Sequence, residues 1–321
     1  MKKTTRSLLL LAMLLPCVSA GCAAGGTATG KEKTALTFAD VGWDSIKLNN
    51  ALAGLIAEKV FGYTWQETPG STPISHEALL KGEIDIHMEE WTSNIRSYAP
   101  DLQAGRFTEL GVNFDDNRQG FYIPKYVADR CPDLKSVKDL ARYAELFPDP
   151  EDASKGIIYG GIVGWEITEI MNKKIAAYGL DKSYNYFASG SDAVLIAAMV
   201  SAWDKKAYYG EPTWLLGKYD FVLLEDEPYD AERYHEGYGA CPSVTVTVAV
   251  SNDFAASNPE FCAFLAKFEM SSAMISEALA YMNTTNAGYE EAAEWLLTKS
   301  HPELLDRWLS PEQAAKVRAA L

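Results

Sequence analysis

The regular alternation of strand-like and helix-like segments is the strongest constraint on the fold. Residues 243–250 alternate valine and threonine with the period of two that a strand requires, and residues 34–41 form another apolar strand. Directly after it, the apolar residues of 46–56 recur at helical spacing. Strands that alternate with helices predict an α/β fold with mostly parallel sheets. The same patterns predict strands at 84–88, 157–163 and 221–224, and helices at 77–81, 166–177, 191–203, 261–270 and from Ser310 onwards.

The length and charge of the chain indicate a globular protein and argue against a nucleic-acid-binding one. The chain has 321 residues, 48% apolar and 23% charged, which is typical of globular proteins. A single hydrophobic core is near its practical size at this length, so we expect two lobes. The formal net charge is −15, and no basic stripe is present to overcome repulsion by a phosphate backbone. The charge therefore argues against nucleic acid as a partner, and it is compatible with a cationic ligand or simply with solubility.

Residues 1–21 have the layout of a secretory signal peptide. Three basic residues precede an apolar run at 8–16, and small residues follow that run. The run is shorter than the ~20 helical residues that span a bilayer. We therefore expect an extracytoplasmic protein, in the periplasm or on the outer face of the cell membrane. Cys22 resembles a lipoprotein cleavage site, so lipidation at Cys22 and simple release are both open, and residues 22–35 are expected to form a flexible tether.

The remaining cysteines give no sign of a metal site. Cys131, Cys241 and Cys262 match no zinc-binding spacing. An odd number allows at most one disulfide, and whether Cys131 and Cys241 pair is open. Cys262 lies in an apolar predicted helix and is expected to be a small buried residue. We predict no metal and no cofactor.

Four of the eight tryptophans stand where a ligand crevice would lie. Trp43 follows the first predicted strand, Trp91 stands a few residues beyond the strand at 84–88, and Trp165 follows the strand at 157–163. In open α/β sheets the ligand crevice lies beyond the carboxyl ends of the strands. Trp214 lies in a loop that could face them. The other four lie within or beside amphipathic helices, where packing explains them: Trp65, Trp203, Trp295 and Trp308.

Several indole faces in one crevice suit a quaternary ammonium group. Such a group has no N–H donor, and its diffuse charge is satisfied by the negative faces of aromatic rings, tryptophan best, at roughly 0.5–2 kcal/mol for each desolvated face. Asp44, Glu90 and Glu166 each adjoin one of these tryptophans and could add attraction, although helix caps or solvated charges explain them equally well. The amides at the start of the helix after Trp43 could hold the carboxylate of a betaine. Asp44 would compete for the same amides, which keeps choline open as the ligand.

At these residues the chain resembles the glycine betaine/choline-type substrate-binding proteins of ABC importers. The matching stretches run in family order over about residues 36–283, and although each is short, their joint order is specific. They are Val41-Gly42-Trp43-Asp44-Ser45, Gly70-Ser71-Thr72-Pro73, Lys81-Gly82-Glu83-Ile84-Asp85-Ile86, Glu89-Glu90-Trp91, Gly111-Val112-Asn113-Phe114, Arg118-Gln119-Gly120-Phe121-Tyr122-Ile123-Pro124, and Pro212-Thr213-Trp214 leading into Lys218-Tyr219-Asp220.

The resemblance implies an α/β, two-lobed periplasmic-binding-protein fold of type II, with the ligand in the cleft between the lobes. Residues 36–117 and 217–321 would form lobe I, and residues 118–216 lobe II, with crossings near 115–120 and 210–217. It further implies a monomer that is not an enzyme. Such a protein would bind a small quaternary ammonium ligand (glycine betaine, proline betaine or choline) and pass it to an ABC permease and ATPase complex for osmoprotectant uptake.

The resemblance also implies an aromatic box around the ligand, altered here on one wall. Trp43 and Trp91 match box positions of the family. In the family segment W-x-P-x-W the first aromatic falls on Gly210 and the second on Trp214. Trp165 falls where some members have a polar or small ligand-contacting residue, so the methylated amine that binds stays open. The expected ligand-binding residues are Trp43, Asp44, Trp91, Trp165, Glu166, Trp214, Tyr209 and Tyr122, with Gln119 as a further candidate for the altered wall.

Two other functions are compatible with the residues. Tryptophan faces also stack on sugars, and Asp44, Glu90 or Glu166 could supply the carboxylate pair of a glycosidase, so a secreted carbohydrate-active enzyme or a sugar-binding protein is the main alternative. An amino-acid-binding protein of the same fold would need a carboxylate for the primary ammonium and fewer rings. The sequence contains no nucleophile elbow, metal-spaced His/Cys set or dinucleotide fingerprint, which argues against an enzyme.

Overall fold

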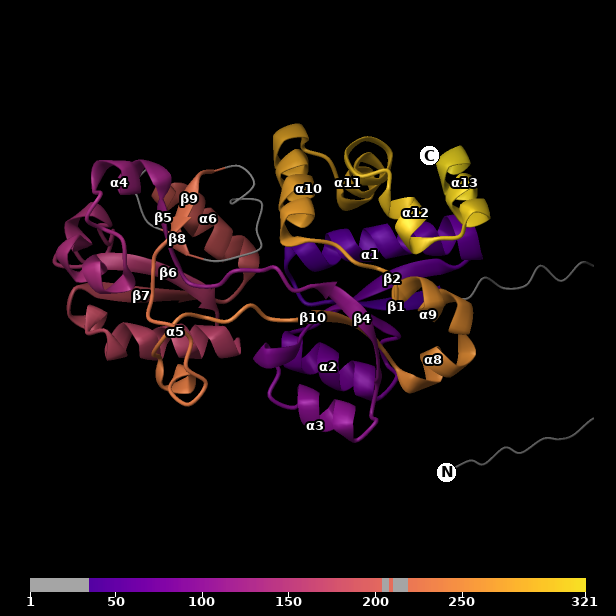
Figure 1. Cartoon of the computed structure of the whole chain (residues 1–321), viewed down its shortest axis with the longest axis horizontal. Coiled ribbons are helices and arrows are strands. Elements are labelled where there is room, and N and C mark those ends of the chain that lie inside the picture. The colour runs from indigo at the N-terminus through magenta and orange to yellow at the C-terminus, as the bar shows by residue number, and fades with distance from the viewer. Residues whose placement is uncertain (1–34, 204–207, 210–218) are drawn as a thin grey trace, which may run out of the picture. The chain divides into compact units, whose positions relative to one another are not determined.

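Three sheets and the helices around them make up the part of the chain that is described. The computed structural model describes residues 35–203, 208–209 and 219–321 (Figure 1). The predicted signal peptide, Cys22, Trp214 and the predicted crossing at 210–217 lie outside the described residues.

The largest sheet has five strands. In spatial order they are β2 (Thr64–Pro69), β1 (Ala35–Asp40), β3 (Ile86–Trp91), β10 (Val246–Val250) and β4 (Thr108–Phe114). β1 runs parallel to β2 and β3, whereas β10 runs antiparallel to β3 and β4. Every residue of β3 and β10 is buried, as expected at the centre of a sheet that is covered on both faces.

Helices cover both faces of this sheet (Figure 1). α1 (Asp44–Ile56) lies between the sheet and the C-terminal helices, while α2 (Thr72–Leu80) and α3 (Tyr98–Gln103) lie on the opposite face. The helix predicted from Ser310 onwards is present, and Ser310 forms a capping box with Gln313 at its start. The helices that follow β10 are α8 (Asn252–Ser257), α9 (Pro259–Leu265), α10 (Ser272–Thr285), α11 (Tyr289–Trp295), α12 (Leu304–Trp308) and α13 (Pro311–Ala320).

Two smaller sheets lie in the middle of the chain. An antiparallel sheet has the order β8 (Tyr208–Tyr209), β5 (Phe121–Pro124) and β9 (Phe221–Leu223), and a parallel pair consists of β6 (Gly156–Ile162) and β7 (Tyr184–Ser189). The helices here are α4 (Lys125–Arg130), α5 (Glu166–Ala177) and α6 (Asp192–Trp203). Short 3₁₀ and π turns complete the described elements: η1 (Ala57–Phe61), η2 (Thr92–Asn94), η3 (Val137–Arg142), η4 (Ala144–Leu146), η5 (Leu180–Lys182), η6 (Tyr234–Glu236) and η7 (Leu296–Ser300).

The expectation of mostly parallel sheets is only partly correct. β1, β2 and β3 are parallel, as are β6 and β7, but β10 and the β8-β5-β9 sheet are antiparallel. The period-two pattern of β10 does not reveal strand direction, because antiparallel and parallel strands share it. Both faces of β10 are buried, and its Thr247 satisfies its hydroxyl with that of Tyr98 at 2.6 Å.

Buried hydrophobic side chains form two separate clusters. The first draws on residues 36–114 and 244–317, and the second on residues 121–234. Partly buried residues as far as Cys241 pack against the second cluster, so the chain returns to the first between Cys241 and Val244. The sequence predicted that the second part of lobe I begins at residue 217. The segment after residue 217 still packs against the second cluster, because β9 pairs with β5.

The three cysteines that the structure describes are Cys131, Cys241 and Cys262. Cys262 is buried in α9, as predicted, and burial raises the pKa of its thiol to about 11. Cys131 and Cys241 are both free thiols.

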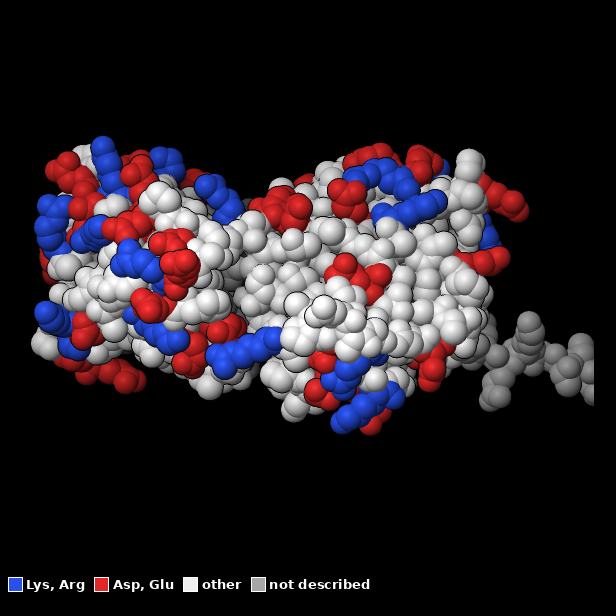
Figure 2. Space-filling model, turned by 60° about the horizontal axis from the view of Figure 1, so that its bottom comes forward, with Lys and Arg blue, Asp and Glu red and all other residues white. Residues whose placement is uncertain are grey.

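On the face shown in Figure 2, acidic and basic side chains intermingle without a continuous basic surface. Among the described residues, no helix has the length and hydropathy needed to cross a membrane.

A buried ionic network connects β3 to α2 and α3. His76 on α2 is 1% exposed, with Nδ1 3.0 Å from Glu90 Oε1 and Nε2 3.3 Å from Asp101 Oδ2. Burial alone would lower the pKa of His76, but its contacts with Glu90 and Asp101 outweigh burial and raise it. For His87, whose Nε2 lies 4.0 Å from Glu90, burial dominates and lowers the pKa. The network therefore stabilises the protonated form of His76 between two carboxylates.

This network predicts a pH-dependent contribution of His76 to stability. A raised pKa in the folded state stabilises the protein fully below the unfolded-state value of about 6.5, and that stabilisation is lost as the pH rises through the folded-state value. We expect His76→Gln to lower the free energy of unfolding by roughly 1–3 kcal/mol at pH 5.5 and by less at pH 9, as measured by urea denaturation. His235→Gln, at an exposed histidine, is the control. A loss of equal size at both pH values would contradict the ionic role.

Candidate functional site

Trp43 and Trp165 occupy equivalent positions at strand-to-helix junctions. Trp43 is the N-cap of α1, three residues beyond the last residue of β1, and Trp165 is the N-cap of α5, three residues beyond β6. Both have extended backbones, and each follows a glycine with positive φ, Gly42 at +92° and Gly164 at +98°. Glycine permits this left-handed turn without strain. The two junctions thus present an indole at the carboxyl end of a strand in the same way.

The two indoles meet although they belong to different hydrophobic clusters. Trp43 packs against the first cluster and Trp165 against the second. Their ring centroids lie 5.3 Å apart with an interplanar angle of 88°. Perpendicular rings in edge contact are a favoured aromatic geometry. The two indole planes are therefore adjacent and nearly perpendicular to each other.

Trp91 joins this pair through a shared carboxylate. It is the last residue of β3 rather than a residue beyond the strand, and it is 8% exposed. Its ring meets that of Phe114 at 5.7 Å and 79°. Its indole Nε1 donates to Glu89 Oε2 at 3.3 Å, and Trp43 Nε1 donates to the same oxygen at 2.8 Å. Three of the four predicted tryptophans are therefore connected, and Trp214 lies outside the described residues.

Glu89 is the site residue that the sequence did not reveal. Its side chain is 1% exposed and accepts hydrogen bonds from Ser45 Oγ at 3.0 Å and Asn49 Nδ2 at 2.7 Å, besides the two indoles. Burial is the largest effect and raises the pKa of Glu89 overall, although each of the four hydrogen bonds lowers it. A run of Glu-Glu-Trp after an apolar strand looks like an exposed strand end, because charged residues are rarely buried unless they are paired. Donors at Ser45 and Asn49, one helical turn apart, were the available signal.

Glu89 and Glu90 face opposite sides of the sheet. Glu89 contacts α1, whereas Glu90 contacts His76 of α2, and these helices cover opposite faces (Figure 1). The register of β3 against β10 shifts between Thr247 and Ala249. Adjacent residues of a strand point to opposite faces of the sheet whether or not the register shifts. Glu90 is therefore neither the helix cap nor the solvated charge that its sequence position suggested.

Asp44 and Glu166 both have protein partners. Asp44 Oδ1 accepts from the hydroxyl of Tyr289 on α11 at 2.7 Å, and the pKa of that hydroxyl is raised by burial and by Asp44. Glu166 Oε2 accepts from both Nε and Nη2 of Arg96 at 2.8 Å. Arg96 follows β3, and Glu166 begins α5. Their ion pair therefore links the segment that carries Trp91 to the segment that carries Trp165.

Two other expected wall residues, Tyr122 and Gln119, are buried. Tyr122 on β5 is 6% exposed and donates its hydroxyl to the Arg118 carbonyl at 3.0 Å. Gln119 is 7% exposed, and within the described part of the chain its Nε2 has no hydrogen-bond partner. β8 pairs Tyr209 with Phe121 across the sheet, and the Tyr209 side chain lies outside what is described.

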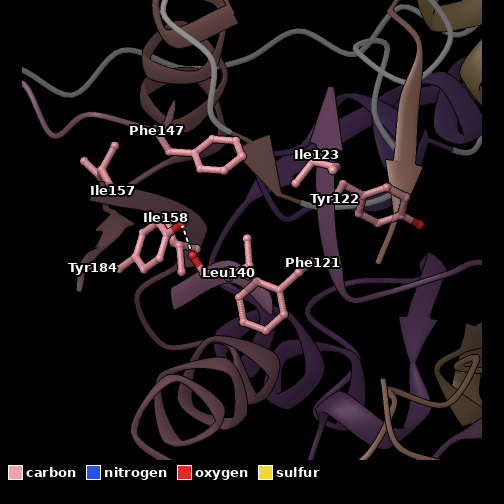
Figure 3. A pocket seen from close by; sticks show the side chains of 8 residues that line it. All are labelled: Phe121, Tyr122, Ile123, Leu140, Phe147, Ile157, Ile158 and Tyr184. Atoms are coloured by element: carbon pink, nitrogen blue, oxygen red, sulfur yellow. Dashed lines mark hydrogen bonds between the residues drawn. The ribbon is translucent and has the colours of Figure 1, made fainter. Parts of the chain in front are cut away.

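A small apolar cavity lies within the second cluster, away from the indoles. Its volume is about 20 Å³, enough for roughly one water molecule. Figure 3 shows its lining, with Tyr184 donating to the Leu140 carbonyl and the Tyr122 ring directed away from them. This cavity is too small for a methylated amine. It is lined by Phe121, Tyr122, Ile123, Leu140, Phe147, Ile157, Ile158 and Tyr184.

Known structures share this architecture. A glycine betaine/L-proline-binding protein from Borrelia burgdorferi has a TM-score of 0.67 and 19% identity, covering 88% of this chain and all of its own. A choline-binding protein in complex with choline has a TM-score of 0.67 and 20% identity, covering 89% of this chain and 97% of its own. A closed lactococcal protein complexed with glycine betaine has a TM-score of 0.67 and 20% identity, covering 87% and 100%. The predicted class, an α/β, two-lobed periplasmic-binding-protein fold, is confirmed.

The family follows from the sequence match. A family model for the substrate-binding domain of ABC-type glycine betaine transport systems matches residues 34–299. The chain belongs to this family. It is therefore the extracytoplasmic substrate-binding protein of an ABC transporter of the glycine betaine/choline type, with a small ligand and a permease and ATPase as partners, and not an enzyme.

The packing of the indoles predicts different stability effects for Trp43 and Trp91. Trp91 is nearly buried against Phe114, so we expect Trp91→Ala to cost about 3–5 kcal/mol of unfolding free energy. Trp43 is only partly buried, and Trp43→Ala should cost less than half as much. Chemical denaturation without ligand measures both. Equal losses for the two variants would show that Trp43 is a core residue like Trp91.

Proposed function

We propose that this protein binds a quaternary ammonium compound, namely glycine betaine, proline betaine or choline, for osmoprotectant uptake. The ligand would contact the faces of Trp43, Trp91 and Trp165, with Trp214 as a further wall. The single observation that carries this proposal is the perpendicular contact between Trp43 and Trp165, two indoles at strand ends of different clusters. Three faces at roughly 0.5–2 kcal/mol each supply a few kcal/mol towards the ~8 kcal/mol of micromolar binding.

The proposal includes a cleft between two lobes. We assign lobe I to residues 36–117 and about 242–321, and lobe II to about 118–241. The second passage of the chain between the lobes is thereby moved from residue 217 to the place where the buried side chains change from the second cluster to the first. Trp43 and Trp91 would then line the cleft from lobe I and Trp165 from lobe II. Closure of the lobes would exclude water, which strengthens the attraction between a cation and aromatic rings.

The start of α1 suits the carboxylate of a betaine. The first amides of a helix lack intrahelical partners and attract anions. Trp43 provides no side-chain cap, and the Asp44 carboxylate accepts from Tyr289. The competition between Asp44 and a bound carboxylate is thereby reduced. This favours glycine betaine or proline betaine over choline, which has no carboxylate.

The carbohydrate alternative is not favoured. A glycosidase needs two carboxyl groups that flank a bond of the substrate. Glu89 and Glu90 are buried with other partners, Glu166 pairs with Arg96, and Asp44 pairs with Tyr289. Export through the signal peptide at 1–21, lipidation of Cys22, a periplasmic location and a monomeric state remain parts of the proposal.

Ligand binding should be selective for methylated amines. We expect the intrinsic tryptophan fluorescence of the protein to shift on titration with glycine betaine, proline betaine, carnitine or choline. Glycine is the matched control, because it has the carboxylate of glycine betaine without its methyl groups, and maltose tests the carbohydrate alternative. A response to maltose alone would refute the proposal.

Loss of one indole should weaken binding much more than it weakens the fold. We expect Trp43→Ala or Trp165→Ala to reduce affinity for the preferred methylated amine at least about tenfold, measured by isothermal titration calorimetry. Trp295→Ala is the control, because that indole stacks on Tyr281 with centroids 4.3 Å apart on the C-terminal helices. Equal affinity losses in Trp43→Ala and Trp295→Ala would assign Trp43 a general packing role.

A further inference from the structure

Glu89 is the point at which the two indoles of the first cluster converge. Oε2 of its carboxylate accepts from Trp43 Nε1 at 2.8 Å, Ser45 Oγ at 3.0 Å and Trp91 Nε1 at 3.3 Å. Oε1 accepts from Asn49 Nδ2 at 2.7 Å. An indole nitrogen can only donate a hydrogen bond. The two ring orientations are therefore fixed against one oxygen atom.

Burial raises the pKa of Glu89, and the donor arrangement acts against burial in favour of the ionised form. Three donors converge on Oε2, and hydrogen bonds donated to a carboxylate stabilise its charge. The side chain is 1% exposed, so water contributes almost nothing to solvating it. A buried charge in a low-dielectric surrounding interacts with another charge more strongly than a solvated one does. An ammonium ligand on the indole faces would experience this charge.

A carboxylate that accepts from two indole N–H groups also changes the electron density of the rings. Donation of an N–H to an anion polarises the donor group, and a more electron-rich ring face attracts a cation more strongly. Of the four acids considered near the indoles, Asp44 and Glu166 are paired with Tyr289 and Arg96, and Glu90 faces α2. Glu89 is the one whose hydrogen bonds go directly to indole N–H groups.

We propose that Glu89 is a positioning residue that orients Trp43 and Trp91 and supplies the negative charge that makes their faces selective for a cation. This inference rests on the proposed function, because it concerns the same ligand. It adds that selectivity for a charged over an uncharged ligand of equal shape comes from a residue that does not touch the ligand.

Glu89→Gln tests the charge while preserving the shape. The Gln oxygen can accept from Trp43, Ser45 and Trp91. Its amide can donate to Asn49 Oδ1, a buried atom without a hydrogen-bond partner among the described residues, once the Asn49 amide turns over. Glu90→Gln is the matched control, since it removes one buried charge from the neighbouring residue of β3 on the other face of the sheet.

The probes separate charge from shape. Choline and glycine betaine are compared with their carbon isosteres, 3,3-dimethylbutan-1-ol and 3,3-dimethylbutanoate, in which a carbon atom replaces the ammonium nitrogen. We expect Glu89→Gln to weaken binding of the ammonium probes about tenfold or more and that of the isosteres less than about threefold. Glu90→Gln should change each affinity less than about threefold. Calorimetry on the full chain gives all of these values.

Equal weakening for charged and uncharged probes would overturn the inference, because it would leave Glu89 a purely structural role, and so would unchanged affinities. If the wild-type chain binds neither choline nor glycine betaine, the proposed function fails and the inference fails with it, whatever Glu89→Gln does. When wild type binds and Glu89→Gln binds equally well, only the inference fails.

A second variant restores the charge at a neighbouring position. Glu89→Gln combined with Asn49→Asp reverses the 2.7 Å hydrogen bond, so that the Gln amide donates to a carboxylate on α1. This variant also covers the case in which Glu89→Gln alone does not fold. We expect it to bind the ammonium probes within about threefold of wild type. If the double variant folds but binds the ammonium probes as weakly as Glu89→Gln is expected to, the proposed role of the charge is contradicted.

Discussion

A buried carboxylate must be matched by donors, and the hydrogen bonds of Glu89 bring the ends of two strands together. Removing such a group from water costs several kcal/mol unless its oxygens are satisfied. The donors come from the junction between β1 and α1 and from the end of β3. Trp43 and Trp91 are therefore held by the same requirement that permits Glu89 to be buried. The orientation of the indoles follows from the electrostatics of the core beneath them.

The strand-to-helix junction explains why indoles appear at equivalent places in both clusters. A glycine with positive φ turns the chain, and the next residue caps a helix with an extended backbone, at Gly42-Trp43 and again at Gly164-Trp165. Neither indole makes a side-chain hydrogen bond to the helix that it begins, so its Nε1 and faces are left for other contacts. β1 and β6 belong to different sheets, so each junction presents its indole at the carboxyl end of its own sheet. The contact between Trp43 and Trp165 joins these two sheet ends.

Local patterns predicted those parts of the structure that depend on local chemistry. The helix at 166–177 is α5, the capping box begins α13, and the strand positions before Trp43 and Trp165 are correct within one or two residues. The edge strand β2 and the direction of β10 depend on pairing partners that are distant in sequence. Glu89 was missed for the same reason, because its burial is permitted by donors on α1 and at its N-cap, at least 40 residues away in the sequence. The end of β3 was placed too early, since two glutamates in a strand are compatible with burial only when such partners exist.

The contacts that join the two clusters near the indoles are individually weak, and this matters for the proposed function. An edge-to-face aromatic pair contributes about 0.5–1.5 kcal/mol, and a surface ion pair such as Arg96–Glu166, whose arginine side chain is 79% exposed, contributes at most about 1 kcal/mol. Micromolar binding supplies ~8 kcal/mol, several times these sums. In the proposed function, the binding free energy of a ligand on the indole faces would therefore exceed the contribution of the protein contacts that join the clusters. The hydrogen bonds of Glu89, in contrast, lie within one cluster, so the orientation of Trp43 and Trp91 does not depend on the contacts between the clusters.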